Sequence, residues 1–265
     1  MNILDKIIAH KKQEVERRKQ LVPSKILEKF NHFQRNCLSA KDWLLDTSKN
    51  GIIAEFKRKS PSKGFFNTSF SPVEVAKGYF EAGCSAMSIL TDEEFFAGKS
   101  EDLEQVREKV NIPLLRKDFI IDEYQLVEAK AIGADLILLI AANLSAKDCM
   151  QLAKFAHSLG LQVLLEVHDA DELASHLNEH IDLVGVNNRN LKTFSVSLDT
   201  SYQLVNQIPS RFLKISESGI DNPKTILELK KAGFHGFLIG ENFMKTENPP
   251  RACLDFANQL KSIEI

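Results

Sequence analysis

Short apolar runs alternate with longer amphipathic stretches along the chain beyond Gly51. The runs are rich in β-branched residues, and consecutive runs lie roughly 20 to 35 residues apart, which leaves room for one crossover helix between neighbours. We therefore expect eight strands, at Ile52–Phe56, Ala86–Leu90, Pro113–Leu115, Leu136–Ala141, Gln162–Val167, Leu183–Val186, Phe212–Ile215 and Gly236–Ile239.

The stretches between the runs repeat apolar residues at helical spacing. Several of them end at a glycine that is soon followed by the next apolar run, as in a helix whose end is capped before a strand. The expected helices include Pro72–Ala82, Asp122–Ile132, Ala146–Leu159, Ala170–Asn178 and Pro223–Ala232.

Regular alternation of buried strands with helices indicates a parallel sheet. An open doubly wound sheet usually has five or six strands, whereas eight units favour a closed (β/α)8 barrel of roughly 250 residues. The chain has 265 residues and no obvious linker. We predict one α/β domain, a TIM barrel spanning residues 51–265.

The first fifty residues show helical spacing and no strand pattern, beginning with Ile3, Leu4, Ile7 and Ile8. Pro23 breaks the first helix and can start a second one. We expect residues 1–50 to form a helical extension that packs on the rim of the barrel and helps to roof the substrate site. The alternative is a plug at the bottom that only stabilises the fold.

Charge and cysteine content exclude several classes of protein. The 34 basic and 36 acidic side chains give a net charge of −2, which disfavours binding to nucleic acid or to a membrane surface. The longest apolar run, Leu136–Ala142, is too short for a bilayer, which takes about 20 residues. The first twenty residues lack the apolar core of a secretory signal. With four cysteines far apart and no C-x-x-C pair, we expect reduced thiols in a cytoplasmic protein.

Polar residues follow the apolar runs at the end of the barrel where chemistry takes place. Glu55 and Lys57 share the inward face of the first run, and Lys117 and Glu166 take inward positions at the ends of the third and fifth. A carboxylate at Glu166 would be costly without a cationic or hydrogen-bonding partner. The alternative for the basic segment Lys57–Lys59 is a solvated surface turn.

The last three runs add an amide, a cation and glycines. Asn187 and Arg189 follow the sixth run, Glu217 and the pair Ser218–Gly219 the seventh, and Gly240 the eighth. Glycines after the seventh and eighth strands let the main chain approach a phosphate closely. A structural ring of salt bridges would explain the charges but neither the glycines nor Asn187. We therefore predict a phosphate-binding active site.

Other chemistries lack support. His176 and His180 lie four apart on an expected helix, but the glutamate of a zincin motif is missing. The glycines form neither a dinucleotide fingerprint nor a P-loop, and no histidine is positioned to activate Ser218. We expect no metal and no cofactor.

Six segments together resemble the indole-3-glycerol phosphate synthase family. They are Ile52–Ser62 (IIAEFKRKSPS), Leu115–Phe119 (LRKDF), Leu165–His168 (LEVH), Gly185–Leu191 (GVNNRNL), Ser216–Ile220 (SESGI) and Leu238–Glu241 (LIGE). The resemblance covers essentially the whole chain. It implies a cofactor-free lyase that closes, decarboxylates and dehydrates 1-(2-carboxyphenylamino)-1-deoxyribulose 5-phosphate to give indole-3-glycerol phosphate.

The resemblance also implies roles for individual residues. Those expected to be catalytic or to contact substrate are Glu55, Lys57, Lys117, Glu166, Asn187, Glu217 and Ser218. Those expected to bind the phosphate are Ser60, Gly219, Gly240 and Glu241, with Arg189 and Leu238 also binding substrate. At Glu241, where some relatives have a small hydroxyl residue, we expect the side chain to point away. The slot for the aromatic ring would be lined by Phe96, Phe119 and Leu138, with Phe95 as an alternative to Phe96.

The chemistry suggests a division of labour. Lys117 is the expected general acid of ring closure, with a pKa lowered by Lys57 and by partial burial. Glu166 would stabilise the cationic intermediate. After CO2 has left, Glu55 with Lys57 would carry out the dehydration, with Lys117 as the rival acid. Alternatives are a phosphoribosylanthranilate isomerase-like barrel, a Schiff-base aldolase and a non-catalytic phosphosugar sensor. The partner in each case is a small molecule, and a monomer is the default.

Overall fold

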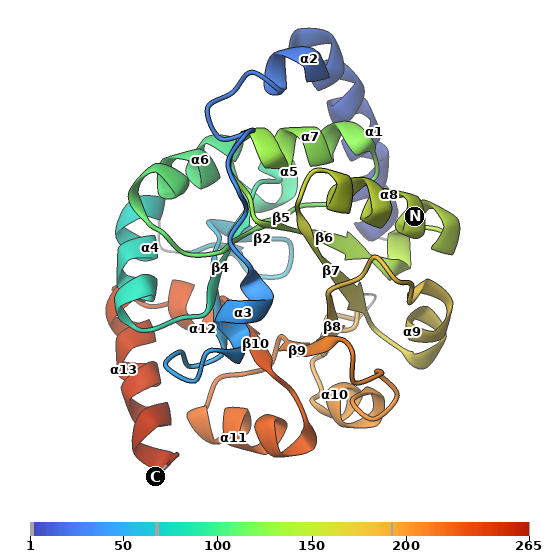
Figure 1. Cartoon of the computed structure of the whole chain (residues 1–265). Helices are drawn as coiled ribbons and strands as arrows, with labels where there is room; N and C mark the ends of the chain where they lie inside the picture. Colours follow the sequence, from blue (N-terminus) through green and yellow to red (C-terminus); the bar gives the residue numbers. More distant parts are fainter. Residues whose placement is uncertain (1–2, 67–68, 192, 265) are drawn as a thin grey trace.

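The computed structural model describes residues 3–66, 69–191 and 193–264. Eight parallel strands form a closed barrel in which β10 pairs with β1, and helices surround it (Figure 1). The predicted (β/α)8 TIM barrel is confirmed. Its strands are β1 (Ile52–Phe56), β4 (Ala86–Leu90), β5 (Leu114–Lys117), β6 (Leu136–Ile140), β7 (Gln162–Val167), β8 (Leu183–Asn187), β9 (Leu213–Glu217) and β10 (Gly236–Ile239).

Three strands continue beyond the apolar runs that predicted them. They are β5, β8 and β9, which end at Lys117, Asn187 and Glu217. The ladder uses main-chain hydrogen bonds, so a polar side chain can end a strand where the inward face meets a cavity instead of the core. β6 is shorter than expected and stops at Ile140, because the 3-10 turn η1 (Ala141–Asn143) begins there.

All five predicted helices are present, and their observed ends differ from the predicted ones by two residues at most. Three further outer helices, α6 (Ser100–Lys109), α10 (Asp199–Leu204) and α13 (Pro249–Ile263), were not among the helices expected by residue range. In α6 the only buried apolar side chains are Leu103 and Val106, which makes its pattern weak. The outer helices are α4 (Pro72–Glu81), α6 (Ser100–Lys109), α7 (Glu123–Ala131), α8 (Ala146–Ser158), α9 (Ala170–His176), α10 (Asp199–Leu204), α11 (Pro223–Ala232) and α13 (Pro249–Ile263).

Short elements after the strands line the end of the barrel where the carboxyl ends of the strands meet, here called the mouth. A two-stranded antiparallel hairpin, β2 (Lys59–Ser60) with β3 (Gly64–Phe65), follows β1. The short helix α5 (Glu93–Phe96) follows β4, and α12 (Glu241–Met244) follows β10. Each contributes residues to the cavity described below.

The opposite end of the barrel is covered by α3 (Ala40–Leu45), which lies across the front of the barrel in Figure 1. Ala40 and Leu44 join the leucines and isoleucines that fill the barrel interior. The main-chain N–H of Ala40 donates to the side-chain oxygen of Gln162, at the start of β7, at 2.7 Å. A Cβ on Gly236 would lie 2.8 Å from Leu44 Cδ2. α3 is therefore fitted closely against the amino ends of the strands.

The long helix α1 (Ile3–Leu21) lies on the mouth side. Its Ile3, Leu4 and Ile7 are part of the cavity wall. Further along, Val15 packs in an apolar cluster with Val127 of α7 and with Leu27 of the short helix α2 (Ser24–Leu27). The extension thus meets the barrel at both ends, α1 at the mouth and α3 at the bottom. That it roofs bound substrate stays a prediction.

The four cysteines are free thiols, and all but Cys37 are buried. Cys84 and Cys253 face each other across the α4–α13 side of the barrel, with their sulfur atoms 3.5 Å apart. In the described segments, no helix is both long enough and apolar enough to cross a membrane.

Candidate active site

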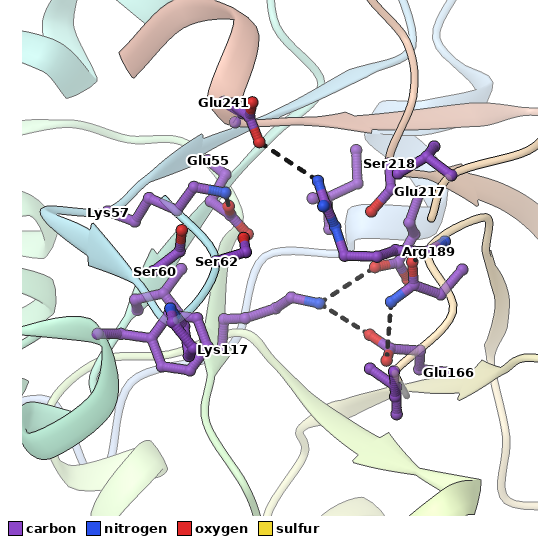
Figure 2. Close-up of a pocket in the computed structure, with 18 of the residues that line it drawn as sticks. Glu55, Lys57, Ser60, Ser62, Lys117, Glu166, Arg189, Glu217, Ser218 and Glu241 are labelled. Carbon is purple, nitrogen blue, oxygen red and sulfur yellow. Dashed lines mark hydrogen bonds and ion pairs between the residues drawn. The ribbon is translucent and has the colours of Figure 1, made fainter. Parts of the chain in front are cut away.

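A cavity of about 370 Å³ lies at the mouth, and every residue assigned to the site from sequence, apart from the alternative Phe95, is on its wall. Figure 2 shows the polar members converging from strands far apart in the chain. What each does in catalysis stays a prediction. The predicted residues on the wall are Glu55, Lys57, Ser60, Phe96, Lys117, Phe119, Leu138, Glu166, Asn187, Arg189, Glu217, Ser218, Gly219, Leu238, Gly240 and Glu241.

Lys117 reaches across the mouth to two carboxylates (Figure 2). Its Nζ lies 2.9 Å from Glu166 Oε2 and 3.1 Å from Glu217 Oε2. The other oxygen of Glu166 accepts a hydrogen bond from Asn187 Nδ2 at 3.1 Å. Asn187 is in register with Glu217 at the ends of β8 and β9. Glu166 therefore has the cationic and hydrogen-bonding partners that its apolar surroundings require.

Gly185 on β8 makes room for the Glu217 carboxylate. A Cβ at this position would lie 2.1 Å from Glu217 Oε1, far inside van der Waals contact. Any side chain here would force the carboxylate out of its place beside Lys117.

The charges around Lys117 set the three pKa values of this cluster. Burial alone would lower the pKa of Lys117, but the carboxylates of Glu166, Glu217 and Glu55 raise it well above its ordinary value. The prediction of a lowered pKa was wrong: of its two assumed causes, burial does act but is outweighed by the carboxylates, and Lys57 pairs with Glu55. The charges that act on Lys117 most strongly are those of carboxylates.

The two carboxyl groups beside Lys117 shift in opposite directions. Burial raises the pKa of Glu166, but Lys117, His168 and hydrogen bonds outweigh it, and the pKa is lowered. Burial also raises the pKa of Glu217; Lys117 offsets this only in part, and the charges of Glu166 and Glu55 add to the rise. Glu166 is therefore the resident anion, and Glu217 is the group that can gain and lose a proton near neutral pH.

Glu55 and Lys57 form a second pair on the same inward face of the first strand and loop. Lys57 Nζ lies 2.7 Å from Glu55 Oε1. Gly240 packs directly against this carboxylate, since a Cβ there would lie 2.4 Å from Glu55 Oε1. The pair is thus adjacent to the predicted phosphate site.

The glycines after β9 and β10 line the same cavity, as the phosphate prediction requires. Ser218 and Gly219 have φ values of 68° and 77°, in the left-handed region. A Cβ on Gly219 would meet Val196 Cγ1 at 2.6 Å, so glycine is needed for space as well as for conformation. Gly219 has no side chain of its own that would keep an anion away from its main chain.

Glu241 does not point away from the cavity as expected. Its Oε2 lies 3.3 Å from Arg189 Nη2 (Figure 2). Its Oε1 lies 3.7 Å from Lys63 Nζ. Arg189, which lines the cavity and is itself a predicted substrate-binding residue, attracts the carboxylate inward, whereas Lys63 is exposed and is not among the residues of the cavity wall. Arg189 is therefore already paired with an anion of the chain.

An apolar wall stands beside Lys117. The rings of Phe96 and Phe119 are 6.0 Å apart between centroids at an angle of 37°, and both line the cavity. Phe95 instead packs edge-on against His10 of α1. The alternative assignment of Phe95 to the cavity wall is therefore wrong. Apolar wall residues that were not predicted include Ile3, Leu4, Ile7, Leu90, Ile140, Leu191, Phe194 and Val196.

His168 is a neighbour of the site to which the sequence analysis gave no role. Its Nδ1 lies 3.1 Å from Glu172 Oε2, and its Nε2 lies 3.5 Å from Glu166 Oε1. Burial lowers its pKa, but Glu172 and Glu166 raise it overall. The sequence could have indicated this position, because the alternation of side chains along a strand places His168 on the same face as Glu166.

Comparisons with known proteins agree with this geometry. The sequence model of the indole-3-glycerol phosphate synthase family matches residues 4–255. An indole-3-glycerol phosphate synthase of Bacteroides thetaiotaomicron is 48% identical over 263 residues, covering 99% of both chains. One of Nautilia profundicola is 44% identical over 254 residues, covering 95% of this chain and 97% of the relative.

Solved structures of low sequence identity share the fold. The 3-hexulose-6-phosphate synthase from Salmonella typhimurium superposes with a TM-score of 0.64 at 10% identity, covering 80% of this chain and 99% of that one. KGPDC from Streptococcus mutans gives a TM-score of 0.58 at 14% identity, covering 81% of this chain and 98% of that one. At such identities the likeness supports the barrel alone. The family match and the two relatives that align almost end to end decide the question: this chain belongs to the indole-3-glycerol phosphate synthase family.

Proposed function

We propose that this protein converts 1-(2-carboxyphenylamino)-1-deoxyribulose 5-phosphate into indole-3-glycerol phosphate, with release of CO2 and water, in tryptophan biosynthesis. The observation that carries the proposal is Lys117 held between Glu166 and Glu217 in the cavity that Gly219 and Gly240 also line. An ammonium between carboxylates suits acid–base chemistry on a carbonyl. Glycine main chain at the same mouth suits a phosphate.

Ring closure needs a proton on the ketone oxygen as the aromatic carbon attacks it. We assign this proton to the ammonium of Lys117. The raised pKa keeps Lys117 protonated in the resting enzyme. The oxygen becomes far more basic than an amine as the carbon–carbon bond forms, so transfer is favourable at that moment. A lowered pKa is therefore not required.

Loss of CO2 follows from the cationic ring that closure creates. The electron pair of the breaking carbon–carbon bond neutralises the ring nitrogen cation, and Glu166 stabilises that cation beforehand. Its lowered pKa supports a permanent negative charge there. Lys57, at the edge of the same cavity, is the candidate partner of the departing carboxylate.

Dehydration removes the former ketone oxygen as water and a proton from the ring. We assign these transfers to the pair Lys57 and Glu55, with Lys117 as the rival acid. The 2.7 Å contact between Lys57 and Glu55 and their position next to Gly240 support this assignment, because the sugar end of the proposed substrate would lie between the ring and the phosphate. Glu217, with its raised pKa, can return a proton to Lys117 after turnover.

The phosphate acts as a handle remote from the reacting carbons. Its binding by the main chain around Gly219 and Gly240, with Ser60, Ser218 and Arg189 nearby, would hold the substrate folded over Lys117. Lysines and main-chain N–H groups can neutralise both anions of the substrate, so we propose a reaction without metal or cofactor. We also propose a cytoplasmic monomer, which light scattering of the purified protein would test.

The direct test is the appearance of indole fluorescence when the protein receives the synthetic substrate in metal-free buffer. Product formation that requires the active protein would support the proposal, and absence of product would refute it. Borohydride trapping with a ketose phosphate tests the Schiff-base alternative. We expect no adduct, because an ammonium paired with two carboxylates is not a nucleophile.

A further inference from the structure

Lys11 of α1 carries a buried ammonium outside the set of residues assigned to catalysis. The side chain is 1% exposed, and its Nζ contacts three carboxylates: Glu14 Oε2 at 2.8 Å, Asp92 Oδ2 at 2.9 Å and Asp118 Oδ1 at 2.9 Å. Glu14 belongs to α1, Asp92 follows β4 and Asp118 follows β5. One cation therefore joins the helical extension to two loops of the mouth.

Both loop carboxylates also fix residues of the aromatic wall. Asp92 caps α5 by accepting a hydrogen bond from the Phe95 N–H at 2.8 Å, and α5 carries Phe96. Asp118 accepts from the N–H of Phe119 at 2.8 Å. Lys11 itself lies one helical turn beyond Ile7, a third residue of the wall. The ammonium is thus a common anchor for Ile7, Phe96 and Phe119.

The need to attach α1 to the barrel does not explain why Lys11 is buried among three carboxylates. Val15 already packs against α7, Arg18 pairs with Glu128 at 2.9 Å, and Lys19 pairs with Asp122 at 2.7 Å. A buried ion cluster is in general no more stabilising than apolar packing of the same volume, because its charges must be desolvated. What it provides is fixed geometry, since each carboxylate must stay within contact of the same nitrogen.

We propose that Lys11 is a positioning residue that sets the separation of Ile7, Phe96 and Phe119, and thereby the width of the slot that admits the aromatic ring of the substrate. This inference rests on the proposed function. It assigns to the extension a part in selecting the substrate. Without the ammonium, α1 and the loops that carry Asp92 and Asp118 are no longer held to a common nitrogen, and the slot widens. When only Lys11 is changed, the uncompensated charge of Asp92 adds to the widening, whereas Asp118 still contacts Arg116.

The test compares two substrates, the native one and an analogue with a methyl group on the aromatic ring. A close-fitting pocket discriminates against one extra methyl group by about ten-fold or more in kcat/KM. The variants are Lys11→Met and the double variant Lys11→Met with Asp92→Asn. The double variant removes one negative charge together with the positive one, and asparagine still caps α5. It keeps the experiment informative if the single variant is poorly folded.

We expect both folded variants to show a KM for the native substrate raised about ten-fold, with kcat within about three-fold of wild type and discrimination against the methyl analogue largely lost. The matched control is Lys19→Met on the same helix, whose ion pairs are half exposed. It should retain the wild-type KM and the wild-type discrimination.

Three results are decisive. A lower melting temperature with unchanged KM and unchanged discrimination in the double variant would mean that Lys11 only stabilises the fold, and would overturn the inference. The same changes in Lys19→Met would overturn it too, because they would follow from any damage to α1. Absence of turnover by wild type would instead refute the proposed function, which the first measurement of the series reveals.

Discussion

Glu217→Gln should make the protein more stable and much less active. Burial and the neighbouring carboxylates raise the pKa of Glu217 from 4.5 to about 7, despite the contact with Lys117. A tenfold change in a proton-binding constant equals about 1.4 kcal/mol. Above pH 7 the ionised Glu217 carboxylate therefore lowers the free energy of unfolding by about 3 kcal/mol. Glutamine keeps the shape of the side chain and removes the charge.

The sign of the pH dependence follows from linkage. The folded protein binds this proton more tightly than the unfolded chain does, so the destabilisation is complete above pH 7. It shrinks as the pH falls from about 7 towards 4.5 and disappears below that value. Glu217 Oε1 has no hydrogen-bond partner within the described part of the chain. An amide nitrogen there would stay unpaired, at a cost of about 1 kcal/mol. The net gain at pH 8 should then be about 2 kcal/mol.

Urea denaturation of wild type and variant at pH 8 and pH 5 measures this gain. We expect it to be present at pH 8 and absent or reversed at pH 5, while kcat falls by about 100-fold or more at both. Glu179→Gln, at an exposed side chain, should change stability by no more than about 0.5 kcal/mol. A Glu217→Gln variant that is less stable than wild type at pH 8, or equally stabilised at both pH values, would refute the argument.

Further predictions concern the assigned roles. Lys117→Met should lower kcat by about 1,000-fold, and single-turnover mixing should show no ring closure; near-normal kcat would exclude Lys117 as the acid. Glu55→Gln should release CO2 faster than it forms indole, so an unchanged ratio of the two products would remove Glu55 from dehydration. Glu241→Ser should lower KM by about five-fold, because it removes a carboxylate worth about 1 kcal/mol of repulsion at the phosphate site, and a raised KM would contradict this. Activity should persist in excess chelator, and a loss that added metal restores would disprove the cofactor-free mechanism.

The barrel was predictable from sequence because buried parallel strands leave apolar runs at regular spacing. The ends of β5 and β9 were not, since Lys117 and Glu217 interrupt the apolar run while continuing the strand. The helix α6 was missed for a related reason. Its inner face relies on polar groups as well as on apolar ones, such as Asp102, which pairs with Arg58. The spacing of apolar residues reveals a helix whose buried face is apolar, but it misses one whose buried face is partly polar.

The members of the candidate site could be listed from sequence, but their pairing could not. Alternation within a strand places Lys117 on the inward face, yet only the barrel register brings Glu166 and Glu217 to its ammonium. The direction of its pKa shift was therefore wrong. Lys11 left a different signal, a lysine that interrupts the apolar stripe between Ile7 and Val15. A lysine in such a position can be identified as buried only when the carboxylates that pair with it are known, and the sequence alone does not identify them.

The fit of α3 against the amino ends of the strands has a consequence for turnover. With that end of the barrel filled by Ala40, Leu44 and the interior leucines, incoming substrate, departing CO2 and the indole-3-glycerol phosphate product share a single passage at the mouth. Product that has not left therefore blocks the next substrate. Inhibition by indole-3-glycerol phosphate should therefore be purely competitive. Release of this product limits kcat whenever it is slower than the chemical steps.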